Sequence, residues 1–432
     1  MRVRKVRLKD FRGFEDETLD LDRPLTVLIG TNGAGKTSVL DALTVVASHL
    51  VARWTNDPSR ARSFTVRDLR SGVSELSVQV DAVLFGQTCV VDATHHADPA
   101  RGTEIHITPG EPVAWQGLME HIRTALARNT PVVLPLVVVY PSKRGIDPAR
   151  EPAKPPDGVE TWDQAMRQGA VYLDALDATE TDFASFFTWF RLREDLENEE
   201  RLGRGVMQHE DRELGAVRRA ISTVLPEVTR IRVRRAPSGL VVQKQDAEYD
   251  VRQLAYGERT VISLVGDLAR RLAMIDPVRP DPLQGEAFVM IDEVDLHLHP
   301  AWQRRIVGSL STAFPNCQFI VSTHSPLVLS EVPTNAVVLL ENFKFRSPAW
   351  PTSGRDSNSI LEEVMGVSER PEGIARAFDE VRAFLDEGRF SEARARLDEL
   401  KRHVTEHDTE WIRLSSELDV LERIAAPPHA GA

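Results

Sequence analysis

The stretch Gly30–Thr37, with the sequence GTNGAGKT, fits the pattern G-x-x-x-x-G-K-[ST]. It overlaps the end of Leu25–Gly30 (LTVLIG), a continuous apolar run that predicts a buried strand. Beyond it, apolar side chains recur at helical spacing, at Val39, Leu43, Val46 and Leu50. A glycine-rich turn between a strand and a helix offers an anion its backbone N–H groups and the positive end of the helix dipole. The stretch therefore predicts a phosphate-binding loop.

The polar side chains of this loop have expected tasks. Lys36 would reach the β- and γ-phosphate oxygens of a nucleotide, and the hydroxyl of Thr37 would ligate Mg²⁺. ATP and Mg²⁺ are therefore the expected cofactors. The residues of this loop expected to bind the nucleotide are Gly30, Asn32, Gly33, Gly35, Lys36, Thr37 and Ser38.

Two carboxylates, Asp292 and Glu293, directly follow the apolar run Phe288–Ile291. Alone, such a pair is as often a solvated strand end, but the phosphate loop in the same chain favours the second half of one site. Asp292 suits the Mg²⁺ shell together with Thr37, and Glu293 suits polarisation of the attacking water. We expect Asp292 and Glu293 to be catalytic.

His324 follows another strand-like run, Gln318–Ser322, within the sequence Thr323-His324-Ser325-Pro326. A histidine just past a buried strand beside the acidic strand can direct a ring nitrogen at the γ-phosphate. The alternative is an ordinary residue at a strand end. The order of the motifs favours a catalytic role.

The segment Arg252–Thr260 (RQLAYGERT) precedes a predicted helix. Gly257 and Glu258 at its start are expected to form a second anion site, which would meet the γ-phosphate bound by another subunit. An ordinary helix cap is the alternative. Arg12, after the first predicted strand, is a further candidate nucleotide contact, with an exposed turn as the alternative.

Composition and charge exclude several classes of protein. The longest apolar run, Val132–Tyr140, is too short for a membrane span and predicts a strand. The two cysteines, Cys89 and Cys317, form no metal or disulfide pattern, so a reducing cytoplasm is the expected setting. A net charge of −12 argues against coating nucleic acid by bulk electrostatics. Arg230, Arg232 and Arg234 could still form a local basic face or, more simply, a solvated sheet face.

The expected fold is α/β, with a nucleotide-binding head over residues 1–345 and a helical insertion at about 158–226. The expected strands include two in Val3–Leu21, joined by a turn at Arg12-Gly13. Residues 346–432 are expected to hold a linker and a helical extension, the linker being Phe343–Asn358. Periodicity within Arg370–Ile424 predicts about three amphipathic helices.

Four motifs occur in this order along the chain: the phosphate loop, L-x-x-G-E-R, apolar-D-E-x-D and S-T-H-S-P. This order resembles the ABC-type ATPase heads of SMC, RecF and OLD proteins, a branch of the AAA ATPases. The resemblance narrows at Ile291–Gln303 (IDEVDLHLHPAWQ), Phe314–Pro326 (FPNCQFIVSTHSP) and Trp189–Asn198 (WFRLREDLEN). These segments look like the ATPases of bacterial defence systems typified by Septu PtuA and its retron-associated relatives. The resemblance is firm over about Arg2–Leu340 and looser over the tail from Ser359 onward.

That resemblance implies an ABC-type head with a helical insertion, a homodimer or higher homo-oligomer, and an HNH-type nuclease supplied by a separate chain. It also places Asp295 in the segment that touches the opposite subunit's site. Two departures predict slow hydrolysis. Ala255 stands where the pattern usually has Ser and Tyr256 where it has Gly, and no clear Q-loop glutamine follows Val132–Tyr140, where Ser142-Lys143-Arg144 stands instead.

The leading hypothesis is an ATPase that dimerises around ATP and regulates a partner nuclease in anti-phage defence, with any DNA contact made together with that partner. A RecF- or SMC-like ATPase of DNA repair or chromosome maintenance is the alternative. Nuclease activity of this chain alone is not expected, since no nucleophile-base set follows Pro326. His297 and His299 could hold a metal, but no third ligand stands near. The aromatic run Phe183–Phe190 is expected to be buried.

Overall fold

Two compact units make up the chain, Met1–Asp356 and Ser357–Ala432. The computed structural model describes residues 1–98, 102–108, 113–128, 130–142, 168–177, 183–205, 208–405 and 407–425. Residues 346–356 group with the first unit. No helix among these described residues is long and apolar enough to cross a membrane.

A six-stranded sheet in the order β14-β13-β3-β12-β11-β7 forms the centre of the first unit. All neighbouring pairs are parallel except β13 and β14. The middle strands are largely apolar because both of their faces are buried. The strands are β3 (Leu25–Gly30), β7 (Leu136–Tyr140), β11 (Ala287–Ile291), β12 (Cys317–Ser322), β13 (Val337–Glu341) and β14 (Lys344–Arg346).

Parallel pairing brings the carboxyl ends of these strands to one edge. Ile291 pairs in register with Val321 of β12 and with Tyr140 of β7, and Val321 pairs with Val27 of β3. The residues that directly follow β3, β11 and β12 therefore lie together, which is where ligands bind in open α/β sheets.

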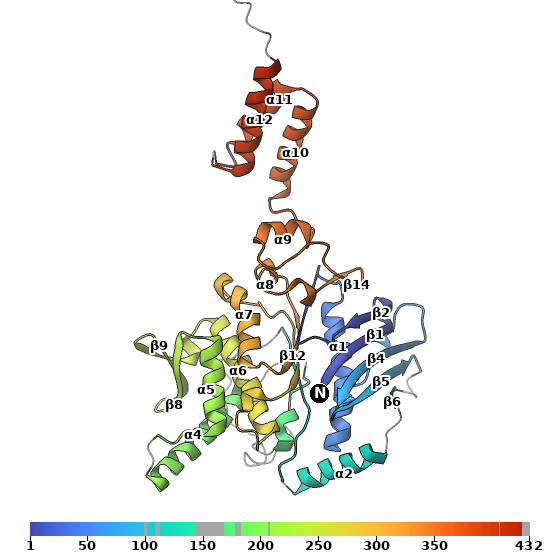
Figure 1. The fold of residues 1–432 in the computed structure, drawn as a ribbon, viewed down its shortest axis with the longest axis vertical. Helices are drawn as coiled ribbons and strands as arrows, with labels where there is room; N and C mark the ends of the chain where they lie inside the picture. The colour runs from blue at the N-terminus through green and yellow to red at the C-terminus, as the bar shows by residue number, and fades with distance from the viewer. Residues whose placement is uncertain are drawn as a thin grey trace, which may run out of the picture. The chain divides into compact units, whose positions relative to one another are not determined.

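A second sheet, antiparallel in the order β2-β1-β4-β5-β6, lies on the other side of helix α1 (Lys36–Thr55), as Figure 1 shows. Helix α1 packs against β3 and β7 of one sheet and against β4 and β5 of the other. This explains why α1 is buried on most sides and has no wide polar face. The strands are β1 (Arg2–Phe11), β2 (Phe14–Asp20), β4 (Glu75–Leu84), β5 (Gln87–His96) and β6 (Thr103–Thr108).

One buried amide ties the two sheets together. The side-chain oxygen of Gln318 on β12 accepts the backbone N–H of Val3 on β1 at 2.8 Å, and its nitrogen donates to the carbonyls of Val3 and Leu21 at 2.7 and 2.6 Å. All polar atoms of this buried side chain are thus satisfied, as a buried amide requires. The contact fixes the antiparallel sheet, and with it Arg12, relative to the parallel sheet.

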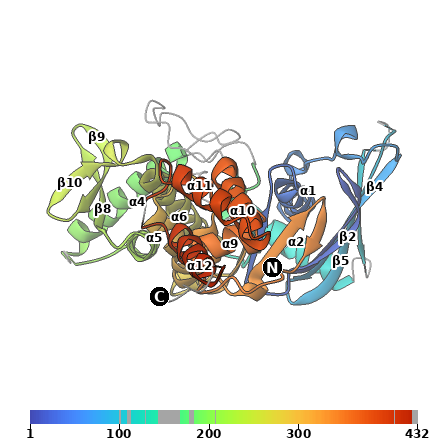
Figure 2. The same cartoon turned by 90° about the horizontal axis from the view of Figure 1, so that it is seen from above.

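A helical lobe lies beside the parallel sheet. Helices α5 and α4 pack on α6, and α6 packs on β7. A small antiparallel sheet, β10-β9-β8, extends this lobe on the side of the unit opposite to β1 and β4 (Figures 1 and 2). The elements are α4 (Phe183–Arg204), α5 (Arg212–Val224), β8 (Val228–Arg235), β9 (Ser238–Lys244), β10 (Ala247–Asp250) and α6 (Tyr256–Ile275).

The aromatic run at the start of α4 is buried, as the sequence predicted, wherever its side chains are described: Phe186, Phe187, Trp189 and Phe190 are at most 8% exposed. Gly266 of α6 admits the ring of Phe186, since a Cβ there would lie 2.5 Å from it. These contacts hold the insertion against α6.

A buried ionic network anchors α6 to β7. The hydroxyl of Tyr140 donates to Asp267 at 2.9 Å, and Arg270 and Arg271 pair with the same carboxylate at 2.5 and 2.6 Å. Burial would raise the pKa of Asp267, but the two guanidinium groups outweigh burial and lower it to about 2. The carboxylate is therefore charged, and its removal would leave buried arginines without their partner.

Among its described residues the first unit also contains α2 (Val113–Ala127), α7 (Pro300–Ala313) and α8 (Pro326–Leu329). The second unit holds α9 (Ser357–Glu363), α10 (Glu372–Asp386), α11 (Phe390–Leu400) and α12 (Thr409–Ala425). Helices α10, α11 and α12 share a core that includes Phe378, Val381, Leu397 and Leu418. The prediction of amphipathic helices in this region is confirmed.

Two local predictions were wrong. The strand expected over Val132–Tyr140 begins only at Leu136, directly after Pro135, which has no N–H to donate to a neighbouring strand. The segment Phe343–Asn358, expected to be a linker, begins with β14, which pairs with β13 around the turn residues Asn342 and Phe343, both with positive φ. Lys143 and Arg144, and most of the expected insertion before residue 183, lie outside the described residues.

Candidate nucleotide-binding site

The predicted phosphate loop joins β3 to α1. Gly33 and Gly35 have φ of 81° and 107°, values that favour glycine. A Cβ at Gly35 would lie 2.9 Å from the rings of Phe14 and Phe343, and one at Gly30 would lie 2.4 Å from the carbonyl oxygen of Leu340. The positive φ of Gly33 and Gly35 thus favours glycine in the turn, and close packing also requires glycine at positions 30 and 35.

Lys36 lies folded over this loop. Its ammonium donates to the carbonyls of Gly30 and Thr31 at 2.8 and 3.1 Å. Burial lowers the pKa of Lys36, while the carboxylates of Asp292, Glu293 and Asp295 oppose that shift. Lys36 is therefore close enough to the acidic strand end to interact with it electrostatically. A phosphate bound on the loop would replace the two carbonyls as the hydrogen-bond acceptor of its ammonium.

Asp292 meets Thr37 across the sheet edge. The hydroxyl of Thr37 donates to Oδ2 of Asp292 at 3.1 Å, and the hydroxyl of Ser322 donates to Oδ1 at 2.5 Å. Ser322 thereby fixes the orientation of the carboxylate. Hydroxyl and carboxylate oxygens are ligands that Mg²⁺ accepts, and Mg²⁺ bound to a nucleotide commonly takes only one or two protein ligands. The pair therefore fits a magnesium ion.

Glu293 stands next in the chain, in a strained position. Its φ is 48°, and its backbone N–H donates to the Ser322 hydroxyl at 2.7 Å. The same serine thus holds both acidic residues. The influence of Glu293 on the pKa of Lys36 and of His324 places its carboxylate near both groups.

His324 lies at the carboxyl end of β12, beside these groups. Burial and the charge of Lys36 lower its pKa, against the opposing pull of Glu293, Asp295 and Asp292. The ring is therefore neutral near pH 7 and has one N–H to donate. The neighbouring Thr323 donates its hydroxyl to Asp295 at 2.5 Å, which ties the segment after the acidic pair to this strand end.

Arg12 lies at the β1–β2 turn, with φ of 50°. Its guanidinium pairs with Asp41 at 2.8 Å and Asp68 at 3.0 Å, and it donates to the hydroxyl of Ser38 at 3.0 Å. The structure therefore brings Arg12 and Ser38 together one residue beyond Thr37. In this arrangement Nε of Arg12 donates to Asp68, and Nη1 donates to Asp41 and Ser38.

The segment Ala255–Glu258 at the start of α6 has its contacts away from the phosphate loop. The carboxylate of Glu258 accepts the backbone N–H of Ala255 at 3.0 Å and the ammonium of Lys244 at 2.5 Å, so it caps the helix. The backbone of Gly257 lies against the carbonyl of His297, since a Cβ there would lie 2.5 Å from that oxygen. Among the described residues, neither Gly257 nor Glu258 contacts the phosphate loop of its own chain.

The two histidines of the H-x-H motif have structural partners. The ring of His297 packs edge-on against Tyr256 at 4.6 Å, and Nδ1 of His299 accepts the backbone N–H of Ala301 as the N-cap of α7. Within the described ranges no three His, Cys, Asp or Glu side chains gather as a metal site would require.

Sequence reasoning missed Ser322 and Phe343. Ser322 holds Asp292 and the Glu293 backbone, and only strand register shows that it faces them. Phe343 covers Gly13 and Gly35 from the turn between β13 and β14. An aromatic residue in that turn was the available signal, but the proline and small polar residues that follow it predicted a linker.

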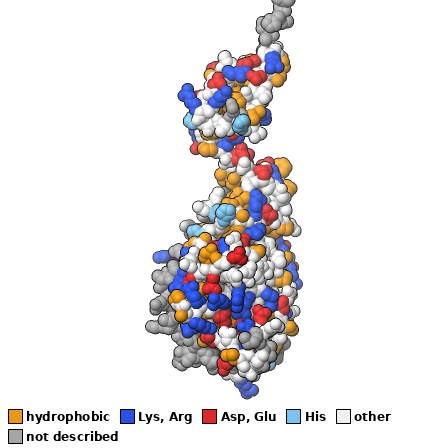
Figure 3. Space-filling view, turned by 90° about the vertical axis from the view of Figure 1, so that its left-hand side faces the viewer, with side chains coloured by type: hydrophobic (Ala, Val, Ile, Leu, Met, Phe, Trp, Pro, Cys, Tyr) orange, Lys and Arg blue, Asp and Glu red, His pale blue; other side chains and the backbone are white. Residues whose placement is uncertain are grey.

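The candidate basic face is largely neutralised. Arg232 pairs with Glu248, and Arg234 pairs with Asp250. Figure 3 looks at the molecule from the side where Figure 1 shows β8 and β9, and basic and acidic side chains lie intermixed there. The sheet thus offers no continuous basic surface among its described residues.

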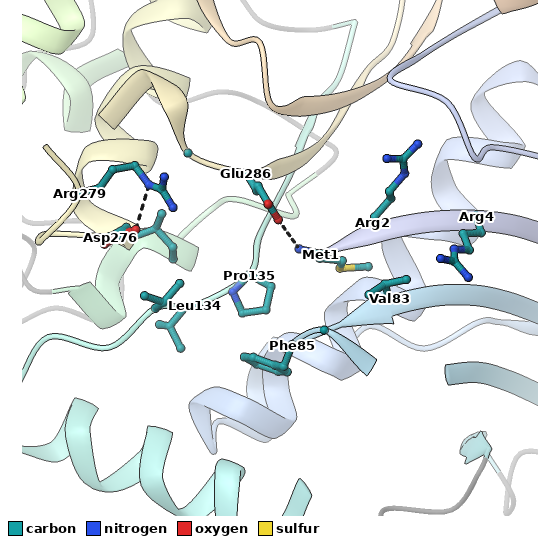
Figure 4. Close-up of a pocket in the computed structure, with 14 residues that line it drawn as sticks. Met1, Arg2, Arg4, Val83, Phe85, Leu134, Pro135, Asp276, Arg279 and Glu286 are labelled. Carbon is teal, nitrogen blue, oxygen red and sulfur yellow. Dashed lines mark hydrogen bonds and ion pairs between the residues drawn. The ribbon is translucent and has the colours of Figure 1, made fainter. Parts of the chain in front are cut away.

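A cavity of about 530 Å³ lies away from all of these groups. Figure 4 shows Phe85, Leu134 and Pro135 along its apolar wall, with Asp276 paired to Arg279 at its rim. It borders the amino ends of β7 and β11, whereas the phosphate loop and the acidic pair lie at the carboxyl ends. The cavity is therefore no part of the nucleotide site.

The sheet order, the phosphate loop after β3, the acidic pair after β11 and the histidine after β12 define a class of protein. The chain is an ABC-type ATPase with a mixed α/β head and a helical C-terminal region. Family models match two parts of it: "AAA ATPase domain" over residues 1–80, and "AAA domain, putative AbiEii toxin, Type IV TA system" over residues 147–330.

Its homologues over most of its length are retron ATPases and Septu PtuA. The retron Ec83 probable ATPase of Escherichia coli is 27% identical, over 86% of this chain and 77% of the relative. The Septu protein PtuA of Bacillus thuringiensis is 22% identical, over 89% of each chain. The solved SMC head domain from Thermotoga maritima is 18% identical, with a TM-score of 0.41, over 78% of this chain and 94% of that one.

Proposed function

We propose that the chain binds Mg²⁺-ATP between two copies of its head, hydrolyses it slowly, and thereby regulates a separate HNH-type nuclease in anti-phage defence. The observation that carries the ATPase proposal is the contact between Thr37 and Asp292. It unites the phosphate loop and the acidic strand end in one cation site. The retron and Septu homologues support the link to defence.

Each group has a role that its position supports. The loop amides and Lys36 would bind the phosphates, and Thr37 and Asp292 would hold Mg²⁺, which would supply neutralisation of phosphate charge. Glu293 orients the attacking water and accepts its proton. His324, neutral near pH 7, donates to the γ-phosphate. Gly30, Asn32, Gly33 and Gly35 shape the loop.

The site of one head is incomplete by itself. The loop of Ala255–Glu258 lies at the start of α6 and has no contact with the phosphate loop of its own chain in the described part of the structure. Its backbone amides at a helix N-terminus are suited to an anion, and that anion would be the γ-phosphate held by a second copy. Because the phosphate loop and the second anion site would then belong to different copies, the proposal includes dimerisation around ATP.

Regulation of a partner is assigned to surfaces outside the nucleotide site. The helices of the second unit carry no site chemistry, and they are suited to contacts with subunits or with the nuclease. DNA contact, where it occurs, is proposed for the complex with the nuclease, since Arg232, Arg234 and Arg235 of β8 are paired with carboxylates.

Two assays on one preparation test this proposal. The purified chain should hydrolyse ATP in the presence of Mg²⁺ and leave DNA intact. Co-expression with an HNH-type nuclease, where one is encoded beside this chain, should yield a complex whose DNA cleavage changes with ATP. Absence of ATPase activity would contradict the enzymatic part, and a neighbouring set of repair genes without a nuclease would contradict the defence role.

A further inference from the structure

Tyr256 is an exposed aromatic residue at the first position of α6, directly after Ala255. Its side chain is 40% exposed, whereas most residues of this helix are buried. Ala255 occupies the N-cap position without a side-chain hydrogen bond, because it carries no oxygen. The loop therefore lacks a hydroxyl at the cap but has one at the next residue.

Two contacts hold the ring of Tyr256 in place. The ring of His297 meets it at 4.6 Å with an interplanar angle of 75°, and the guanidinium carbon of Arg259 lies 5.4 Å from its centroid. His297 is itself fixed by a left-handed backbone, with φ of 62°, and by the close approach of its carbonyl to Gly257. Both contacts engage the aromatic ring and leave the hydroxyl at its far end for another partner.

We propose that the phenolic hydroxyl of Tyr256 donates a hydrogen bond to the γ-phosphate bound by the facing head, replacing the hydroxyl that Ala255 lacks. This inference rests on the composite site of the proposed function and names one of its donors. A phenol O–H is a hydrogen-bond donor, and a bond to a phosphate oxyanion is charge-assisted. Arg259 adds positive charge beside the ring.

The ring of Tyr256 can also have an effect opposite to that of its hydroxyl. A ring in the place of a glycine can hold the two heads apart, so that Tyr256 would obstruct the site rather than complete it. The two effects differ in the atom concerned. Donation needs only the hydroxyl oxygen, while obstruction needs the ring.

Tyr256→Phe separates them, because it keeps the ring and its contacts with His297 and Arg259. We expect this change to lower the ATPase rate and to weaken ATP-driven dimerisation about tenfold or more, the loss of one charge-assisted hydrogen bond. Ala255→Ser in the Tyr256→Phe background should restore most of the loss. Tyr249→Phe is the matched control, since Tyr249 on β10 is also 40% exposed and should leave both measurements unchanged.

Dimerisation is measured by light scattering in the Glu293→Gln background, and ATPase rates are measured with Glu293 intact. Unchanged values for Tyr256→Phe, or a faster enzyme on Tyr256→Gly, would overturn the donor role while leaving the composite site standing. Failure of Glu293→Gln itself to dimerise with ATP would overturn both the composite site and this inference.

Discussion

The hydroxyl of Thr37 lies 3.1 Å from Oδ2 of Asp292, although 255 positions separate the two residues in the chain. The parallel order of β3, β12 and β11 produces this contact, because it brings the ends of all three strands to one edge. Ser322, at the end of the middle strand, holds the other oxygen of the same carboxylate. The proposed cation site thus depends on three separate strand ends.

Asp292→Asn should remove the gain in ATP affinity that Mg²⁺ provides, because an amide oxygen is a weaker ligand than a carboxylate. The expected loss is on the order of tenfold with Mg²⁺ and little without it. Titrations of ATP with Mg²⁺ and with a chelator measure both. Asp246→Asn, in an exposed turn, is the control. If Mg²⁺ raises the ATP affinity of the wild type and of Asp292→Asn equally, Asp292 is not a ligand of the metal ion.

Lys36→Ala should weaken ATP binding at least tenfold, since the ammonium is proposed to contact the phosphates and such bonds are charge-assisted. Calorimetric titration measures the affinity directly. Lys344→Ala changes an exposed lysine on β14 and should leave the affinity unchanged. If the two variants bind ATP equally well, Lys36 does not contact the phosphates.

Asp267→Asn should destabilise the first unit by about 3–5 kcal/mol, because it leaves Arg270 and Arg271 buried without their counter-ion. The folded pKa of Asp267 is about 2, below its ordinary value of 3.8. Its contribution is therefore fully present above about pH 4 and is lost as the pH falls towards 2. Urea denaturation of both proteins should show a constant difference from pH 7 to pH 4 and a smaller one below. A difference that shrinks between pH 7 and pH 5 would contradict the network.

Truncation after Asp356 should leave ATP binding within a few-fold and change assembly or partner recruitment. Asp356 is the end of the first compact unit, so the cut keeps β14 and the contact of Phe343 with Gly35. ATP titration, light scattering and co-purification with the nuclease measure the three properties. Normal assembly and normal recruitment by the truncated head would show that the second unit has another role.

Local patterns predicted much of this fold. An apolar strand, a glycine-rich turn and a helix are adjacent in sequence around Lys36, and the carboxylates follow directly from a second apolar strand. The amphipathic pattern of Arg370–Ile424 likewise predicted helices that the structure confirms. These features need only neighbouring residues, so periodicity and spacing were sufficient.

Other features depend on pairing across the chain. The hydrogen bonds of Ser322 to Asp292 and to the Glu293 backbone depend on strand register. The ion pairs of Arg12 need Asp41 and Asp68 from two other segments. Phe343 is brought to the phosphate loop by a hairpin whose turn resembles a linker in composition. No local pattern contains that information.

Closure of two heads around ATP can be observed with the Glu293→Gln variant. This change should keep ATP binding and slow hydrolysis, so that the closed form accumulates. Light scattering with Mg²⁺-ATP should then show twice the mass, or twice the number of subunits, found without nucleotide, while Lys36→Ala shows no change. Equal masses of Glu293→Gln with and without ATP, at saturating nucleotide, would contradict the account.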